Sequence, residues 1–439
     1  MKRRLLPILM TLVLVCALPI WAAFVTSGDV TNPLGGTAGA TSSEESAVEK
    51  LKLAISRGGT VQLTEDIEIT QTLYVERSMT IDLNGHVLKM TGDGSVLKVS
   101  GRATLTIQDS SAAKSGTITG GNAKDGGGVY IEAYATLEMT GGCITGCRAE
   151  DGGGVYIDNN ATLKMTGGCI TDCHASYGGG IYSYENLYMG GTAKIEKCTS
   201  NGGSYDAIWN RERCNIYADG GTVDGTVSNL GTIMHSEGAA AETVFNGTVY
   251  NRSAGKIEAG IYKGTVENTG TITGGTFYDA VTNRKASLSF MTEAGTISGG
   301  TFYGSIVNEG GPEQVADSAK VAVTFNTDGG TSVAEEKVLR GQKMSKPAAP
   351  TKSGYTFTGW EDANGAYDFN TPVIAPLTLT ARWEEVPSSG GNYYYHSTTD
   401  TKADDAKGSP KTADPGVALY AALSLLSLTG LTYTGRKKF

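Results

Sequence analysis

The sequence predicts an all-β protein whose main part is a right-handed parallel β-helix solenoid. A block of 26 residues that opens with three glycines begins at Gly126, Gly152 and Gly178, and such a period indicates stacked structural units. Within each block, short runs alternate apolar and polar residues, as half-buried strands do. Glycine pairs separate these runs, so each block turns corners between short strands.

The repeat also predicts the core. Equivalent residues of successive coils lie one strand spacing apart, about 4.8 Å, so like side chains stack on like. One coil cannot bury its apolar face without its neighbours. The side chains expected to point inward are Val129, Ile131, Leu137, Met139 and Ile144, followed one coil later by Val155, Ile157, Leu163, Met165 and Ile170.

The cysteines leave alternatives open. Six of the seven lie between Cys143 and Cys214. Cys147, Cys173 and Cys198 share one corner of the coil, where many β-helices carry asparagine, and we expect buried, stacked thiols there. Disulfides between stacked equivalents are the alternative, because adjacent coils lie within disulfide reach. A metal site is least favoured, since no histidine pair with zinc-finger spacing accompanies the cysteines, and we expect no cofactor.

With these repeats, the stretch resembles the pectate-lyase-like right-handed β-helix superfamily, and in particular the GG[GA]-[IV]-Y repeats of bacterial surface proteins. That superfamily includes both enzymes and adhesins, so the resemblance implies the fold and leaves the function open. The net charge of −9 argues against nucleic acid or anionic membrane surfaces as direct partners.

The first 27 residues predict a signal peptide. A basic start at Lys2, an apolar run to Ile20 and small residues at Ala22 form the expected pattern. Cleavage is expected after Ala23 or near Ser27, and an uncleaved anchor helix is the alternative.

Residues 42–311 form the predicted solenoid. Ser42 and Glu45 make an S-x-x-E capping box for a short helix, whose apolar face consists of Val48, Leu51 and Ile55. We expect this helix to cover the open end of the stack, where unpaired strand edges would recruit other chains. Looser G-x-[VIF]-x-G-x-V-x-N segments continue the stack to a total of roughly ten to twelve coils.

Residues 321–384 change in composition. A VTFxxxGG opening at Val323, a P-x-x-P-x-x-x-G-Y-x-F-x-G-W run from Pro347 to Trp360 and a final LTLTARW resemble the Listeria–Bacteroides repeat, or internalin B-repeat. The resemblance implies a small β-grasp-like module. Its expected core residues are Tyr355, Phe357, Trp360, Phe369 and Trp383, with an exposed aromatic ligand site as the alternative.

The end of the chain predicts an anchor. Residues 385–408 are polar and are expected to form a disordered spacer. Residues 409–439 contain a short motif, an apolar stretch long enough to cross a bilayer as a transmembrane helix and a basic terminus. These features resemble a sortase sorting signal of Gram-positive bacteria. The motif residues are Ser409, Pro410, Lys411, Thr412 and Ala413.

The sorting-signal resemblance implies a sortase and cell-wall peptidoglycan as partners, with cleavage after Thr412. Ala413 departs from the usual glycine, and a plain membrane tail is the alternative. The membrane is then contacted only through the signal peptide and this tail.

Two sets of residues are candidates for function. Asp125 and Asp151 stack just before the glycine triplets and are the candidate catalytic acids of a polysaccharide-degrading enzyme, either a lyase or a glycoside hydrolase. Tyr130, Tyr156 and Tyr182 form an expected outward row that suits binding. The regular coils lack long loops around a cleft, so we expect an adhesin or display module for glycan or host-protein ligands. The alternatives are an enzyme and a structural spacer.

Overall fold

The computed structural model describes residues 46–203, 206–285, 294–311 and 314–387. The predicted signal peptide, the sorting signal with its apolar tail, nearly all of the spacer, and the pair Ser42 and Glu45 lie outside these residues. Within the described ranges, no helix is long and apolar enough to span a bilayer.

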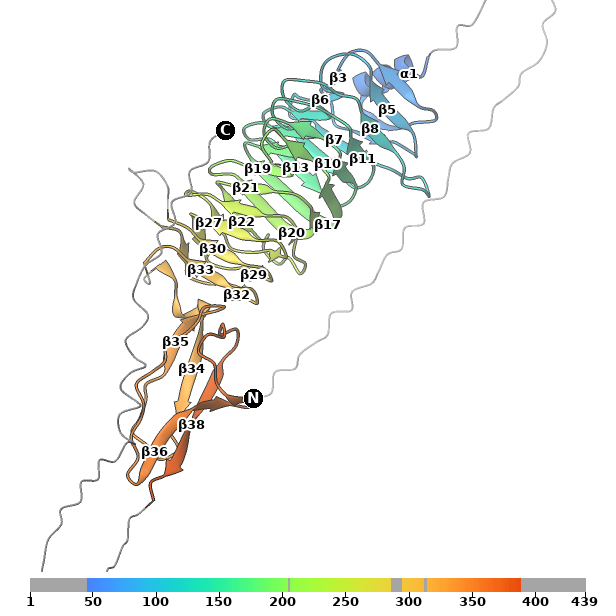
Figure 1. Ribbon diagram of the computed structural model, residues 1–439. Coiled ribbons are helices and arrows are strands. Elements are labelled where there is room, and N and C mark those ends of the chain that lie inside the picture. The colour runs from blue at the N-terminus through green and yellow to red at the C-terminus, as the bar shows by residue number, and fades with distance from the viewer. Residues whose placement is uncertain (1–45, 204–205, 286–293, 312–313, 388–439) are drawn as a thin grey trace, which may run out of the picture. The chain divides into compact units, whose positions relative to one another are not determined.

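The predicted fold class is confirmed, because residues 59–308 form a parallel β-helix with three strand faces (Figure 1). Strands of one face pair in parallel with the equivalent strands of the coils before and after. The first face contains β1 (Gly59–Gln62), β4 (Met79–Asp82), β7 (Thr104–Gln108), β10 (Thr136–Met139), β13 (Thr162–Met165), β17 (Asn186–Glu196), β20 (Asn215–Val223), β22 (Thr232–Met234), β25 (Lys256–Ile257), β28 (Thr271–Ile272) and β31 (Thr296–Ile297).

The second face joins the first through β17 and β20, which are long enough to run around a corner of the coil. Its other strands are β2 (Ile67–Ile69), β5 (Val87–Met90), β8 (Thr117–Thr119), β11 (Cys143–Thr145), β14 (Cys169–Thr171), β23 (Val244–Phe245), β26 (Ile261–Tyr262), β29 (Thr276–Phe277) and β32 (Thr301–Phe302). A two-stranded corner ladder contains β15 (His174–Ala175) and β18 (Thr199–Ser200).

The third face is a separate sheet of eleven strands, which gives eleven coils and agrees with the predicted range. Its strands are β3 (Leu73–Val75), β6 (Leu97–Val99), β9 (Val129–Ile131), β12 (Val155–Ile157), β16 (Ile181–Ser183), β19 (Ile208–Asn210), β21 (Val227–Asn229), β24 (Val249–Asn251), β27 (Val266–Asn268), β30 (Val281–Asn283) and β33 (Ile306–Asn308).

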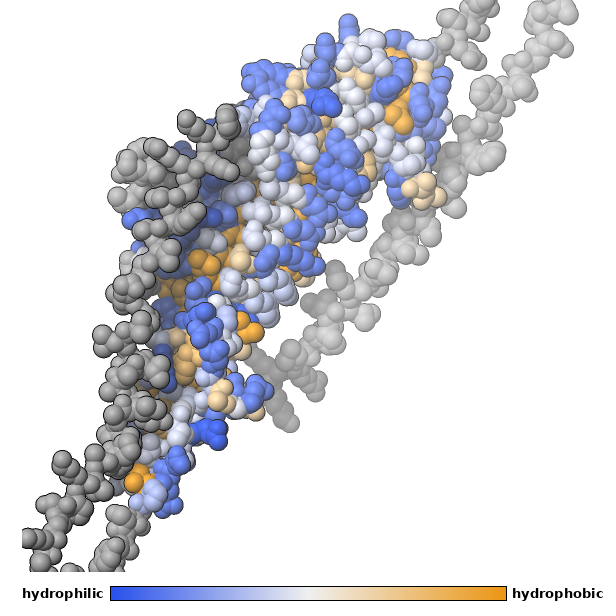
Figure 2. All heavy atoms as spheres, viewed as in Figure 1, coloured by the Kyte–Doolittle hydropathy of each residue, from blue (hydrophilic) through white to orange (hydrophobic). Residues whose placement is uncertain are grey.

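The core follows the predicted register. Leu137 pairs with Leu163 and Ile144 with Ile170 across one coil, and all ten side chains predicted to point inward are fully buried. Polar side chains cover much of the visible surface of these coils (Figure 2). Identical apolar residues therefore form continuous columns through the stack.

The capping helix is α1 (Ala47–Arg57). Ser46 is its N-cap and accepts a hydrogen bond from the Glu49 amide, so the capping pair lies four residues after the predicted one. Leu51 and Ile55 are buried against the first coil, and Val48 packs beside them, as predicted.

The later coils are shorter than the repeated 26-residue blocks. Only 17 positions separate Val249 from its partner Val266, and only 15 separate Val266 from Val281. In this part of the stack, buried asparagines end the strands of the third face. Their side-chain amides hydrogen-bond from coil to coil, from Asn210 through Asn229, Asn251, Asn268 and Asn283 to Asn308.

The cysteines divide between two of the outcomes considered. Cys147, Cys173 and Cys198 are free, buried and stacked at one corner, as predicted for that position. Cys143 and Cys169, which pair in register on the second face, form a disulfide, so the alternative holds there. Asparagine does form a ladder in this fold, but at the strand ends of the third face.

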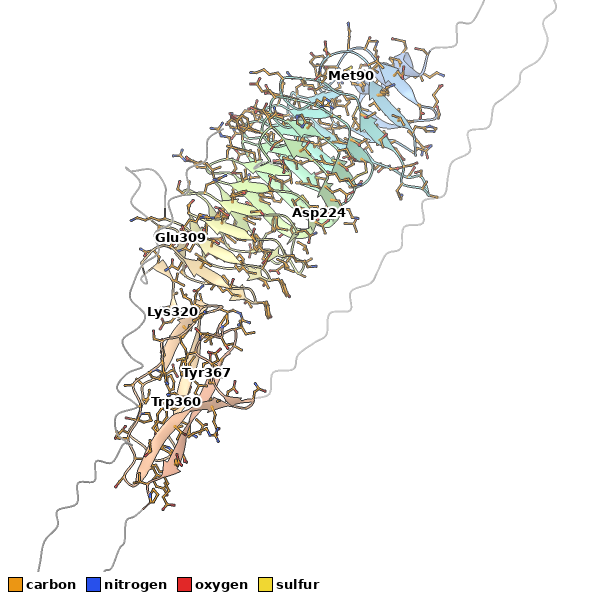
Figure 3. The ribbon with its side chains drawn as sticks, in the orientation of Figure 1. Met90, Asp224, Glu309, Lys320, Trp360 and Tyr367 are labelled. Carbon is orange, nitrogen blue, oxygen red and sulfur yellow. A yellow bond between two sulfur atoms is a disulfide. The ribbon has the colours of Figure 1, made fainter. Side chains whose placement is uncertain are left out.

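The small β module contains β34 (Lys320–Asn326), β35 (Glu336–Leu339), β36 (Tyr355–Asp362), β37 (Gly365–Ala366) and β38 (Leu377–Glu385). These strands form their own five-stranded sheet in the order β35-β34-β38-β36-β37. Its side chains are drawn in Figure 3, in which Trp360 and Tyr367 are labelled. Trp360 is buried, and Phe357, Phe369 and Trp383 pack against the same cluster, whereas Tyr355 is exposed. Four of the five predicted core aromatics therefore contribute to the core. A 3-10 turn, η2 (Asp317–Ala319), precedes the five strands.

Candidate functional site

The outward side of the third face is the candidate site. Each strand contributes its middle residue, because the two flanking residues point into the core. Parallel pairing holds these middle residues in one row along the stack. In chain order the row is Tyr74, Lys98, Tyr130, Tyr156, Tyr182, Trp209, Ser228, Tyr250, Glu267, Thr282 and Val307.

Four consecutive rings of this row stack face to face, and we call Tyr130, Tyr156, Tyr182 and Trp209 the aromatic row. Successive ring centroids are 5.0, 5.5 and 6.2 Å apart. The rings cover one another, so Tyr156 and Tyr182 are only 9% and 6% exposed. A ligand therefore meets ring edges along the row.

Charged side chains hold the aromatic row in place. The Lys98 ammonium lies 4.7 Å from the centre of the Tyr130 ring and pairs with Glu132. The Tyr130 hydroxyl donates to Asp158 at 3.1 Å. At the other end, Arg211 donates to the hydroxyls of Tyr182 and Tyr184.

The two candidate acids lie beside the row. Asp125 and Asp151 pair in register at the corner that precedes the third face, and Tyr177 follows them in the next coil. Burial raises the pKa of both carboxyls, and the charges of Asp125 and Glu150 add to the effect on Asp151, whose pKa reaches about 6. The corner thus brings two carboxyls together at neighbouring levels of the stack.

A first groove of about 690 Å³ opens at the start of the aromatic row. Tyr74 and Tyr130 line it together with Lys98, Lys124 and Asp125. The Tyr74 ring is 57% exposed and makes no stacking contact with another described ring. Sugars bind to uncovered aromatic rings through their apolar faces, so this groove offers both a ring and charged hydrogen-bonding groups.

A second groove of similar volume lies at the other end of the aromatic row. Tyr182, Tyr184 and Trp209 form its aromatic wall, while Arg211 and Asn159 supply polar groups. The two grooves therefore flank the stacked rings on one side of the solenoid.

Sequence reasoning singled out Tyr130, Tyr156, Tyr182 and the two acids but missed Tyr74, Lys98, Trp209 and Arg211. These residues occupy coils without the glycine triplet, so the 26-residue period does not mark them. Extending the strand register from Tyr130 back to Lys98 and Tyr74, and from Tyr182 forward to Trp209, would have found the three row members.

Comparison with known proteins identifies one module. Residues 322–382 match the family model of the Listeria–Bacteroides repeat domain. This is the repeat that the sequence resembled.

Two curated relatives come from Evansella cellulosilytica. One, named "Putative Gly-rich membrane protein", is 36% identical over 66 residues, which cover 14% of this chain and 8% of that protein. Another, named "Putative membrane protein", is 38% identical over 78 residues, or 17% of this chain and 11% of that protein. The chain thus spans about a tenth of the length of the curated relatives it matches.

Proposed function

We propose that this protein is a secreted, cell-wall-anchored adhesin of a Gram-positive bacterium, and that its solenoid binds an extended glycan along the third face. The repeat domain at 322–382 and the short matches to proteins named as membrane proteins support a surface location. The sorting motif from Ser409 to Ala413 supports covalent attachment by a sortase.

One observation carries the binding proposal: a groove lies at each end of the aromatic row, on the same face of the stack. Coils about 4.8 Å apart present the row residues at regular steps. A linear polymer has a similar regularity, so it contacts several coils at once and gains affinity from many weak contacts. A small ligand would fill only one groove.

A glycan screen with the full-length protein tests this proposal. The wild type should retain at least one polysaccharide, and Tyr74→Ala should weaken retention about tenfold, because it removes the open ring of the first groove. Tyr134→Ala is the matched control, since Tyr134 is equally exposed, at 55%, but lines neither groove. Equal losses in both variants, or no retained glycan, would refute binding at this face.

A second candidate function is polysaccharide cleavage, favoured by the raised pKa of Asp151 beside Asp125. A carboxyl that stays protonated near pH 6 can act as a general acid, with its neighbour as the base. The same screen would then release new reducing ends or unsaturated products. These products should disappear in Asp125→Asn and Asp151→Asn and persist in Asp66→Asn, which changes an exposed acid outside both grooves.

Anchoring is tested separately. If a sortase cuts after Thr412, the wild type should leave the cell only after wall digestion. Thr412→Ala should shift the protein to the medium or to the membrane fraction, whereas Thr401→Ala, in the preceding polar spacer, should stay wall-bound. Release of the wild type by detergent alone would argue for the plain membrane tail.

A further inference from the structure

Arg211 lines the second groove together with Trp209, the last ring of the aromatic row. It follows β19 directly, and its backbone amide donates to the Ser183 carbonyl of the preceding coil. Its guanidinium lies 4.3 Å from the centre of the Tyr184 ring. Nη1 donates to the Tyr182 hydroxyl at 3.1 Å and also to the Tyr184 hydroxyl.

These contacts orient the guanidinium and keep it charged. Burial opposes the charge, but the hydrogen bond to Tyr182 and the nearby hydroxyls outweigh it and raise the pKa of Arg211 above its ordinary value. Only Nη1 is used by the two tyrosines. The edge formed by Nε and Nη2 therefore has two parallel N–H groups left, which is the geometry that binds a carboxylate or a sulfate through two hydrogen bonds.

Among the described residues, no carboxylate forms an ion pair with Arg211, and no acceptor takes a hydrogen bond from Nε or Nη2. Arg284, at the same position four strands further along the third face, shows the contrast. It binds Glu267 through Nε and Nη2 and Glu309 through Nη1. Nε and Nη2 of Arg284 are thus paired with a carboxylate of the protein itself, whereas the same two groups of Arg211 have no such partner in the described structure.

The acidic residues of the second groove do not fill this role. Glu185 accepts hydrogen bonds from the Asn160 amide and from Asn186 Nδ2. Glu212 lines the groove beside Arg213 but does not reach Arg211 within ion-pair distance in the described structure. Two arginines and two glutamates line the groove, so their formal charges sum to zero. Binding of an anion here would therefore depend on the directed N–H groups of Arg211 and not on the net charge of the groove.

We propose that Arg211 binds the carboxylate or sulfate group of an acidic glycan that lies in the second groove against Trp209 and Tyr182. This inference rests on the proposed glycan binding and specifies its ligand class. The neutral parts of the sugar would contact the ring edges and Asn159, while the charged group would take the two open N–H donors.

Three polymers with one backbone test the inference: dextran, carboxymethyl-dextran and dextran sulfate. The full-length wild type should bind at least one charged polymer more tightly than dextran. Arg211→Gln should lose this preference, about a tenfold drop or more, since each charge-assisted hydrogen bond contributes strongly. Arg211→Lys should keep only part of the preference for the charged polymer, because lysine keeps the positive charge but lacks the two parallel N–H donors of the guanidinium. Whichever of the two charged polymers binds more tightly shows whether the site prefers a carboxylate or a sulfate group.

Arg102→Gln is the matched control. Arg102 also lies over a tyrosine ring, that of Tyr134, at 5.0 Å, but it lines neither groove. Equal affinities of the Arg211→Gln and Arg102→Gln variants for charged polymers, or no preference of the wild type for charge, would overturn the inference. Retention of neutral glycans in the wider screen would then leave the proposed function intact, whereas retention of no glycan would remove both.

Discussion

The buried asparagine ladder shows how one residue type serves a stack of coils. Each Asn Nδ2 donates to the Oδ1 of the next asparagine, 2.7–2.9 Å away, and most donate also to a backbone carbonyl of their own turn. The bonds run in one direction. Asn210, at the start, therefore keeps a buried Oδ1 without a described partner, because the previous coil has Ser183 at that position.

Asn251→Ala should interrupt this ladder in its middle. The substitution removes the acceptor of Asn229 and the donor to Asn268, and it leaves buried polar groups unpaired. We expect a loss of about 2–4 kcal/mol in the free energy of unfolding, measured by denaturant titration. Asn246→Ala, at an exposed asparagine, should cost under about 0.5 kcal/mol. Similar values for both would mean that the ladder contributes little.

Asp151 should make stability depend on pH. Its folded pKa of about 6 lies above the ordinary value of 3.8, so the folded state binds the proton more tightly than the unfolded state. The stabilisation is therefore complete below about pH 3.8 and is lost as the pH rises through about 6. Melting temperatures between pH 4 and 7 should fall in the wild type and change less in Asp151→Asn, which cannot ionise. A parallel decline in both proteins would contradict this assignment.

At the scale of the element, the glycine triplets set how closely coils approach. A Cβ on the middle glycine, Gly153, would lie 2.5 Å from the Gly179 carbonyl oxygen and 2.6 Å from that of His174. Gly127, one coil earlier, meets the same backbone crowding. The triplet is thus required by the contact between neighbouring corners, which explains its recurrence in the sequence.

Gly153→Ala should consequently destabilise the solenoid. The added methyl group would clash with backbone atoms, so the backbone itself would have to shift. We expect a loss of about 1–3 kcal/mol in the free energy of unfolding. Gly190→Ala is the matched control within β17, because its Cβ would meet nothing closer than 3.8 Å. Thermal unfolding of the two variants gives the comparison. Equal melting temperatures would show that the corner tolerates side chains.

At the scale of the whole solenoid, stability comes from contacts between adjacent coils. Cys143 and Cys169, Leu137 and Leu163, and Tyr130 and Tyr156 each join neighbouring coils. In such a stack each unit depends mainly on its two neighbours. A whole coil is therefore the unit that can be removed without misaligning the rest.

Deletion of residues 152–177 should leave a folded β-helix. The cut removes one period, so Gly178 takes the place of Gly152 and Ile181 takes that of Val155. Circular dichroism should retain the β spectrum, with a lower melting temperature because one interface and the disulfide are lost. Deletion of 152–164, half a period, should misalign the apolar columns and prevent folding. A folded half-period variant would contradict the nearest-neighbour account.

The sequence by itself determined the solenoid, its 26-residue register, its inward columns and the repeat module. These properties follow from local periodicity: alternation fixes which face is buried, and a strict repeat fixes which residues stack. The apolar periodicity likewise predicted a short helix at the start of the solenoid. The N-cap residue of that helix is Ser46 and not the predicted Ser42.

Only the tertiary structure decided which cysteines pair, how short the later coils are, and where the charged ends of the aromatic row lie. Lys98, Trp209 and Arg211 come from coils of unequal length, so no fixed spacing brings them together in the sequence. Their placement depends on parallel pairing between whole coils. That pairing aligns residues by position on a face and not by their distance along the chain.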